Sequence, residues 1–200
     1  MMIKITKKIN IMVLTVILFV GLTACGKEET DTSDTITSTK EPEKNIIEKK
    51  KLSEESYGTI KDGIYTATGG AMQMSVPDTW EVSEEDATIL VAGKEEDTKD
   101  CVIIHIAEKD NEFKNYKQED FEEAYNILFD NLEFEEFKQT KFANLEAIYM
   151  KYSCSKDNTD ITEYQYMLNG DSTYLISFTD VSGELEKEIK TCMDSIVICK

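Results

Sequence analysis

Three segments in the second half of the chain alternate apolar and polar residues, and turn-forming residues join them. They are AIYMKYSC at 147–154, ITEYQYML at 161–168 and TYLISF at 173–178. A strand places every second side chain on the same face, so this period of two predicts three strands. The link NGD is short enough to require antiparallel pairing, and the link SKDNTD is also turn-forming. We therefore expect an antiparallel meander.

One face of this meander is expected to be buried and the other to be mixed. The apolar residues assigned to the buried face are Ile148, Met150, Tyr152, Cys154, Tyr164, Tyr166, Leu168, Tyr174, Ile176 and Phe178. The opposite face is expected to carry polar, aromatic and apolar residues together, namely Tyr149, Lys151, Glu163, Gln165 and Met167. Such mixtures suit contact with a partner protein. Ordinary cover by a helix or by solvent is the alternative.

Shorter apolar segments precede the meander. The segment IYTATGGAMQMSV at 64–76 predicts two short strands around Gly69 and Gly70. The second of these strands places three apolar residues on one face, Met72, Met74 and Val76. The segments ATILVAG at 87–93 and CVIIHIAE at 101–108 predict a hairpin that is covered on both faces.

Two segments have a helical period instead. Residues 117–132 place apolar side chains on one helical stripe, which is Phe121, Ala124, Tyr125, Leu128 and Leu132. Residues 182–196 do the same with Leu185, Ile189, Cys192, Met193 and Ile196. The order is strands, helix, strands and helix. Because the strands form hairpins, this order favours an α+β fold, in which helices flank an antiparallel β-sheet, over a doubly wound parallel sheet.

The first 25 residues contain lysines followed by an uncharged, apolar run that ends at Cys25. The run from Ile11 to Ala24 is shorter than the about 17 to 25 residues of a membrane-spanning helix, which favours a secretory signal. An uncleaved transmembrane anchor is the alternative. The residues LTAC at 22–25 resemble the lipobox of bacterial lipoproteins. This resemblance implies that residues 1–24 are cleaved and that Cys25 carries a diacylglyceryl group, whose two acyl chains hold firmly to a membrane.

Composition sets the domain boundaries and excludes one class of partner. Residues 25–57 are rich in Glu, Lys, Thr and Ser and are expected to form a flexible tether, which leaves residues 58–200 as one globular domain. The chain has 22 Lys and Arg against 40 Asp and Glu, a net charge of -18. Nucleic-acid binding requires clustered positive charge, so nucleic acid is excluded. The expected partners are the membrane, through the lipid anchor, and an envelope protein.

The stretch MQMSVPDTW and the order of elements carry a family resemblance. A short strand ends at Pro77 and is followed by Trp80, a hairpin, a helix, a three-strand meander and a final helix. Over about residues 58–198 this resembles the PsbP-like fold. That fold is shared by the extrinsic PsbP protein of photosystem II, a nuclear-import factor that binds the GTPase Ran, and many bacterial lipoproteins. The resemblance implies a non-enzymatic binding or assembly module with no shared catalytic set.

Catalytic and metal chemistry find little support in the sequence. His105 is the only histidine, and it shares a strand face with Cys101. Four residues along a strand span about 13 Å, which is too far for a nucleophile and its base. His105 is therefore expected to be structural, and no catalytic residue, metal or cofactor is expected. The acidic groups at 84–86, 95–97 and 157–160 could hold Ca²⁺ but are expected to face solvent.

Four cysteines follow Cys25, and they are Cys101, Cys154, Cys192 and Cys199. Outside the cytoplasm they could form disulfides or remain buried thiols, and the sequence leaves both open. Cys192 and Cys199 cannot pair if one helix runs through both, because seven helical residues span about 10.5 Å.

These features predict a membrane-anchored, extracytoplasmic lipoprotein whose domain is a non-enzymatic binding or scaffolding module for an envelope component. The alternative is a small-ligand or cation receptor that presents a solute to a transporter. An open apolar cleft lined by Trp80 and the tyrosines would favour the receptor. A filled core with an exposed patch would favour a protein partner.

Overall fold

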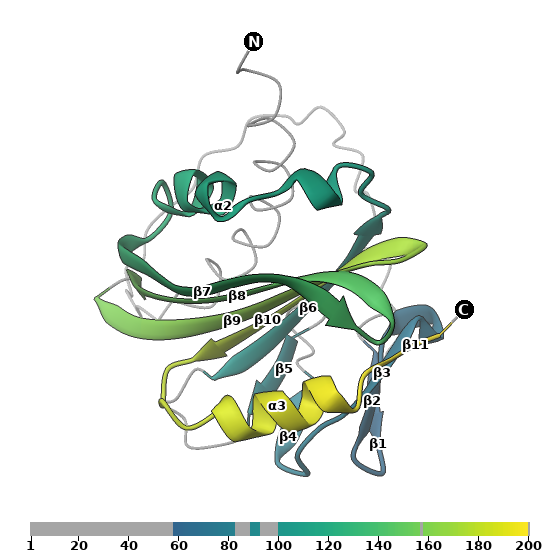
Figure 1. Cartoon of the computed structure of the whole chain (residues 1–200). Helices are drawn as coiled ribbons and strands as arrows, with labels where there is room; N and C mark the ends of the chain where they lie inside the picture. The colour runs from purple at the N-terminus through teal and green to yellow at the C-terminus, as the bar shows by residue number, and fades with distance from the viewer. Residues whose placement is uncertain (1–57, 83–88, 93–99, 157, 200) are drawn as a thin grey trace, which may run out of the picture.

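The computed structural model describes residues 58–82, 89–92, 100–156 and 158–199 (Figure 1). Cys25, the expected leader and tether, and the acidic groups at 84–86 and 95–97 lie outside the described residues. None of the helices in the described ranges has the length and apolar character needed to span a membrane.

The strands form two antiparallel sheets. The larger sheet has seven strands in the order β4-β5-β6-β10-β9-β8-β7. Its strands are β4 (Trp80–Val82), β5 (Ile89–Ala92), β6 (Cys101–Glu108), β7 (Asp130–Phe142), β8 (Leu145–Lys156), β9 (Thr159–Asn169) and β10 (Ser172–Asp180). The smaller sheet has four strands, β1 (Thr59–Lys61), β2 (Ile64–Thr66), β3 (Met72–Ser75) and β11 (Val197–Ile198), in the order β1-β2-β3-β11. The expected hairpin of β5 with β6 and the expected meander of β8, β9 and β10 are confirmed.

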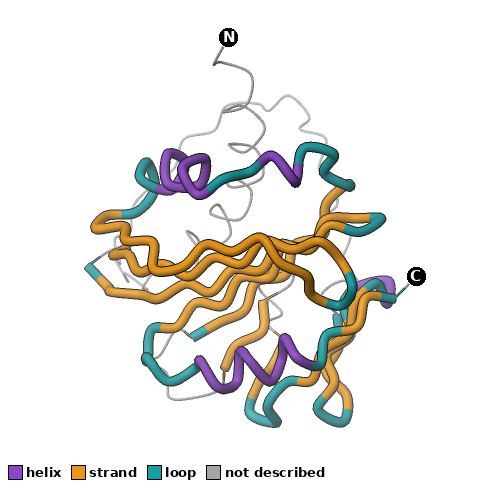
Figure 2. Tube along the Cα trace, viewed as in Figure 1, coloured by secondary structure: helices purple, strands orange, loops and turns teal. Residues whose placement is uncertain are grey.

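Two α-helices lie on opposite sides of the larger sheet, as Figures 1 and 2 show. They are α2 (Gln118–Tyr125) and α3 (Glu186–Asp194), and short 3-10 turns lie at η2 (Thr68–Gly70) and η3 (Phe113–Asn115). All five apolar residues of the helical stripe expected at 182–196 are buried, which confirms the C-terminal helix and the residues on either side of it. The architecture is therefore the expected α+β fold, an antiparallel sheet flanked by helices.

The helix expected at 117–132 was predicted too long. α2 ends at Tyr125, and Leu132 belongs to β7, a thirteen-residue strand that the sequence pattern did not predict. Asn131 adopts a positive φ of 52°, a left-handed conformation that a continuing right-handed helix does not allow. Pairing with β8 then fixes the strand, because Phe134 lies opposite Tyr152. The meander thus has four long strands, where three were expected.

The sheet separates two hydrophobic cores. We call the sheet side under α2 the α2 face, and its core contains Phe113, Tyr116, Phe121, Ala124, Tyr125, Ile148, Met150, Tyr152, Cys154, Ile161, Met167 and Leu175. The opposite side is the α3 face, whose core contains Trp80, Val102, Ile104, Tyr164, Tyr166, Leu168, Tyr174, Ile176 and Phe178 beside the buried residues of α3 and the smaller sheet. Met72, Met74 and Val76, which were expected to share one strand face, are all buried in this second core.

Candidate functional site

The five residues expected to share one partner-binding surface are divided between the two faces of the sheet. Glu163, Gln165 and Met167 lie on the α2 face and are buried. Tyr149 and Lys151 lie on the α3 face, opposite Tyr166 and Tyr164 in the register of β8 with β9. The five residues therefore do not form one surface.

The cause of this error is the register between strands. The alternation predicted within each strand is correct. However, Met150 lies opposite Gln165, and residues that pair across antiparallel strands share a face. Ile148, Met150, Tyr152 and Cys154 consequently belong to the α2 core, whereas Tyr164, Tyr166 and Leu168 belong to the α3 core. A helix covers each face of the meander, and on the α3 face Tyr149 and Lys151 of β8 remain partly exposed.

Gln165 is the centre of a buried polar row on the α2 face. The hydroxyl of Tyr125, on α2, donates a hydrogen bond of 2.6 Å to Gln165 Oε1. Gln165 Nε2 in turn donates to the hydroxyls of Tyr152 at 3.0 Å and of Ser177 at 3.1 Å. The amide thus connects α2 to β8 and β10. Because buried polar groups are costly unless paired, this row positions the helix on the sheet.

Glu163 continues the same row. Its carboxylate accepts hydrogen bonds from the hydroxyls of Ser177 at 2.8 Å and Thr179 at 2.6 Å. Burial raises the pKa of both Tyr125 and Tyr152, and the negative charge of Glu163 raises them further. The two phenols therefore stay protonated and act as neutral hydrogen-bonding groups. This arrangement holds the fold and leaves the carboxylate shielded from solvent.

Two buried aspartates hold the turn between β10 and α3. Asp100 Oδ1 accepts hydrogen bonds from the backbone N–H groups of Val181 at 2.7 Å and Ser182 at 2.9 Å. Asp180 accepts from the N–H groups of Gly183 at 2.7 Å and Leu185 at 3.3 Å. Asp180 also accepts from the hydroxyl of Ser182, whereas the second carboxylate oxygen of Asp100 is buried without a hydrogen-bond partner. Within the described residues, no group of three or more His, Cys, Asp or Glu side chains is arranged to hold a metal ion.

The two expected site residues on the α3 face belong to an aromatic and charged strip near the β7 edge. The rings of Tyr149 and Tyr166 lie 4.8 Å apart, and Lys151 Nζ lies 5.3 Å from the centre of the Tyr164 ring. Lys151 also forms an ion pair of 2.7 Å with Glu135 on β7. This ion pair raises the pKa of Lys151, and burial raises the pKa of Tyr149 to about 12. The charged part of the candidate site therefore lies toward β7.

An open hollow of about 570 Å³ lies where η3 meets the β7–β8 hairpin. Its lining is Phe113, Lys114, Gln139, Thr140, Lys141, Glu146 and Ala147. Lys114 forms an ion pair of 2.8 Å with Glu146 across it. Trp80 does not line this hollow, because its side chain is buried and packs against Phe178 with ring centres 6.4 Å apart. The tryptophan and the tyrosines Tyr164 and Tyr166 fill the core instead.

Cysteine positions narrow the possible disulfides. Cys154 lies in the α2 core and Cys192 in the α3 core, so the sheet separates them. α3 ends at Asp194 and Cys199 follows β11, so no single helix runs through Cys192 and Cys199. The helical spacing that would have excluded a disulfide between Cys192 and Cys199 therefore does not apply.

His105 is expected to make the stability of the domain depend on pH. It lies in the middle of β6, as expected, and burial lowers its pKa from the usual 6.5. The unfolded chain then binds a proton more readily, so stability should fall as the pH drops below about 6.5 toward the lower folded-state pKa. Urea unfolding near pH 7.5 and near pH 5 should show this loss in the wild type and a smaller one in His105→Gln. NMR titration of this single histidine provides the control, and a pKa at or above 6.5 in the folded protein would contradict the expectation.

Comparisons with known proteins identify the fold. No family model matches the chain, and no curated protein matches it. Among solved structures it is similar to the PsbP protein CyanoP of Synechocystis sp. PCC 6803, with 9% identity, a TM-score of 0.50, and coverage of 68% of this chain and 91% of that one. This likeness confirms the expected PsbP-like fold.

Two further solved structures are similar to the chain. LpqN, described as involved in cell envelope biogenesis of Mycobacterium tuberculosis, has 10% identity and a TM-score of 0.47, with 64% of this chain and 83% of that one covered. PA94 of Pseudomonas aeruginosa, a protein of unknown function, has 14% identity and a TM-score of 0.47, with 64% and 92% covered.

Proposed function

We propose that this chain is a lipid-anchored, extracytoplasmic lipoprotein whose PsbP-like domain is a non-enzymatic module that binds or scaffolds another envelope component. The supporting observation is how the domain uses its polar groups. Glu163, Gln165 and Asp180 are buried and bonded within the fold, whereas exposed charged side chains follow the outer strand β7. Charged side chains on an exposed strand can recognise a partner of complementary charge, which gives specificity to an interface.

The anchor is supported by the sequence LTAC at the end of an apolar run. Replacing Cys25 with Ala should move the protein from the membrane fraction to an unprocessed or released form, because both acyl chains are lost. Cys199→Ala is the matched control, since the same substitution at a cysteine near the other end of the chain should leave fractionation unchanged. Membrane fractionation that is identical for Cys25→Ala and wild type would refute the anchor.

The binding role requires a separate experiment. Cross-linking of the full chain in intact cells, followed by mass spectrometry, should recover cross-links to envelope proteins through lysines on or near β7, such as Lys138 and Lys141. Turnover of an envelope substrate by the purified chain would refute the non-enzymatic assignment. Cross-links confined to cytoplasmic proteins would refute the extracytoplasmic one.

A receptor for a small solute is the second candidate, and the hollow beside η3 is the observation in its favour. Two lysines, Lys114 and Lys141, line it together with Glu146, which pairs with Lys114, so one lysine charge is left to favour a small anion over a cation. Thermal stabilisation of the full chain by such an anion, lost in Lys114→Ala, would favour the receptor. The same screen without any stabilisation would favour the protein-binding module.

A further inference from the structure

We propose that β7 is a self-association edge, at which two copies of this chain pair antiparallel about a two-fold axis near Phe137 and extend the seven-stranded sheet across both molecules. The proposal is independent of the lipid anchor. It goes beyond the proposed function by naming a second copy of the chain as a partner and β7 as the place of contact.

The edge has the length that strand pairing needs. β7 is the last strand of its sheet and has thirteen residues, and within the described ranges it pairs only with β8. Its other side therefore carries a row of backbone N–H and C=O groups that a further strand can use. Figure 1 shows β7 at the front of the sheet, and no other described strand or helix lies beyond this edge.

β7 also carries two features that usually prevent an edge strand from pairing, which are bulges in its register and charged side chains. The register with β8 shifts between Asp130 and Glu133 and again between Phe134 and Glu136. From Glu136 to Phe142, however, the pairing with β8 is unbroken. This regular half is long enough for a strand of ordinary length, so the bulges limit the contact without removing it.

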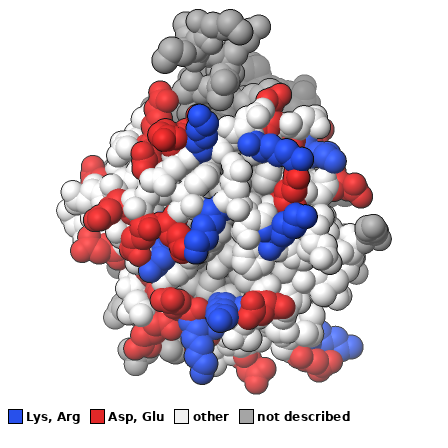
Figure 3. All heavy atoms as spheres, in the orientation of Figure 1, with Lys and Arg blue, Asp and Glu red and all other residues white. Residues whose placement is uncertain are grey.

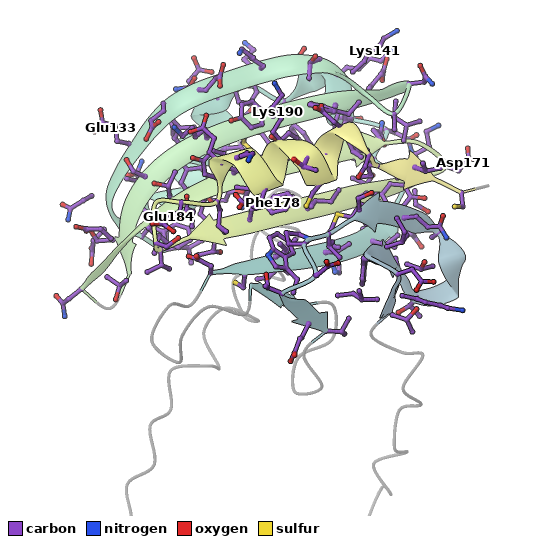
Figure 4. All side chains as sticks on the ribbon, turned by 90° about the horizontal axis from the view of Figure 1, so that it is seen from below. Glu133, Lys141, Asp171, Phe178, Glu184 and Lys190 are labelled. Carbon is purple, nitrogen blue, oxygen red and sulfur yellow. The ribbon has the colours of Figure 1, made fainter. Side chains whose placement is uncertain are left out.

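The order of the charges favours a second copy over an unrelated strand. The acidic residues of β7 all lie in its first half and are Asp130, Glu133, Glu135 and Glu136, whereas its lysines, Lys138 and Lys141, lie in the second half. Figure 3, in the orientation of Figure 1, shows acidic side chains gathered on the left of this face, with lysines and further acidic side chains in the middle and on the right. Glu133 and Lys141 lie near opposite ends of the strand in Figure 4. Charge of either sign would be enough to protect the edge from pairing with another strand. Because the acidic residues and the lysines lie in different halves of β7, however, a second β7 running antiparallel places opposite charges against each other.

Pairing about Phe137 brings the central charges directly together. Glu136 then lies opposite Lys138 of the second copy, and Lys138 lies opposite Glu136 of the second copy. Both side chains are on the α3 face, because they pair with Lys151 and Tyr149 of β8. Residues that pair across antiparallel strands share a face, so the charges meet. Within one chain Lys138 already forms an ion pair with Glu136, and the dimer would join two such pairs into an alternating group of four charges.

Charge reversal tests this arrangement. Two copies of the full chain with different tags are expressed together and recovered through one tag from a whole-cell detergent lysate, so the result does not depend on where the chain resides. Wild-type copies should co-purify. Glu136→Lys places two lysines opposite each other on each side of the axis, and Lys138→Glu places two glutamates there. Each reversal should therefore weaken self-association by about tenfold or more, because two opposite-charge contacts become like-charge contacts.

The mixed pair is the decisive sample. One tagged copy carries Glu136→Lys and the other carries Lys138→Glu, so every facing charge is again opposite and co-purification should return toward the wild-type amount. Both side chains are partly exposed, at 33% for Glu136 and 60% for Lys138, and their reversal leaves the cores intact. Recovery in the mixed pair also requires that both variants fold.

Matched controls place the same charge changes away from β7. Glu81→Lys lies on β4, at the other edge of the same sheet, and Lys187→Glu lies on the exposed side of α3. Neither should change co-purification. The proposal is overturned if wild-type copies do not co-purify, if the β7 reversals act no more strongly than these controls, if the mixed pair is not rescued, or if β7 holds a different polypeptide instead of a second copy.

Discussion

Replacing Phe178 with alanine is expected to lower the free energy of unfolding by about 3–5 kcal/mol. Phe178 is fully buried in β10, beneath α3, and its ring lies 6.4 Å from that of Trp80 and 6.1 Å from that of Tyr166 (Figure 4). Truncation removes apolar contact and leaves a cavity that the close-packed rings cannot fill. Equilibrium unfolding in urea, followed by the fluorescence of the single tryptophan, measures the loss.

Two further variants separate cavity formation from a general sensitivity of the fold. Phe178→Leu keeps much of the volume and should cost less than Phe178→Ala. Ile127→Ala removes a large side chain that is 76% exposed and should change stability by no more than about 0.5 kcal/mol. If Phe178→Ala were as mild as Ile127→Ala, the α3 core could not be packed as described.

Replacing Asp180 with alanine is expected to cost about 2–4 kcal/mol, because buried donors lose a charged acceptor. Asp180 is 4% exposed, and it accepts from the N–H groups of Gly183 and Leu185 and from the hydroxyl of Ser182. These bonds shape the turn that leads from β10 into α3. Loss of the acceptor should therefore loosen the start of the helix, which hydrogen exchange at Gly183 and Leu185 would detect.

Conservative and distant variants make this second prediction specific. Asp180→Asn keeps one side-chain acceptor and should fall between wild type and Asp180→Ala. Asp171→Ala changes an exposed aspartate in the β9–β10 turn and should stay within about 0.5 kcal/mol of wild type. Equal stability of Asp180→Ala and Asp171→Ala would show that the turn does not depend on the buried carboxylate.

The sequence predicted those parts of the fold that depend on local pattern. Two kinds of element repeat a simple period and formed as expected. They are the alternating strands β8, β9 and β10, and the helix α3 with its apolar stripe of Ile189, Cys192 and Met193. The end of α2 was missed because Leu128 and Leu132 continue its apolar period, although the helix ends at Tyr125 and Asn131, already in β7, adopts a left-handed conformation. Asparagine tolerates that conformation, so it is the local signal that could have shortened the predicted helix.

The candidate site was harder to predict because it depends on register. Knowing that Met150 and Gln165 each alternate within their strands does not say that they lie opposite each other. That pairing is set by the turn between β8 and β9 and by the helices that cover each face. The hydroxyls of Ser177 and Thr179 were missed for the same reason, since their bonds to Glu163 cross from β10 to β9.

The smaller sheet draws its strands from both ends of the domain. β11 pairs with β3, and the N–H group of Cys199 bonds to the carbonyl oxygen of Ala71 at 3.0 Å, more than a hundred residues away in sequence. A ribosome or export channel that releases the chain from its N-terminus therefore delivers β3 long before β11, the strand that pairs with its outer edge. The domain can complete its assembly only after β11 has emerged, and deletion of residues 197–200 should leave β3 with an open edge.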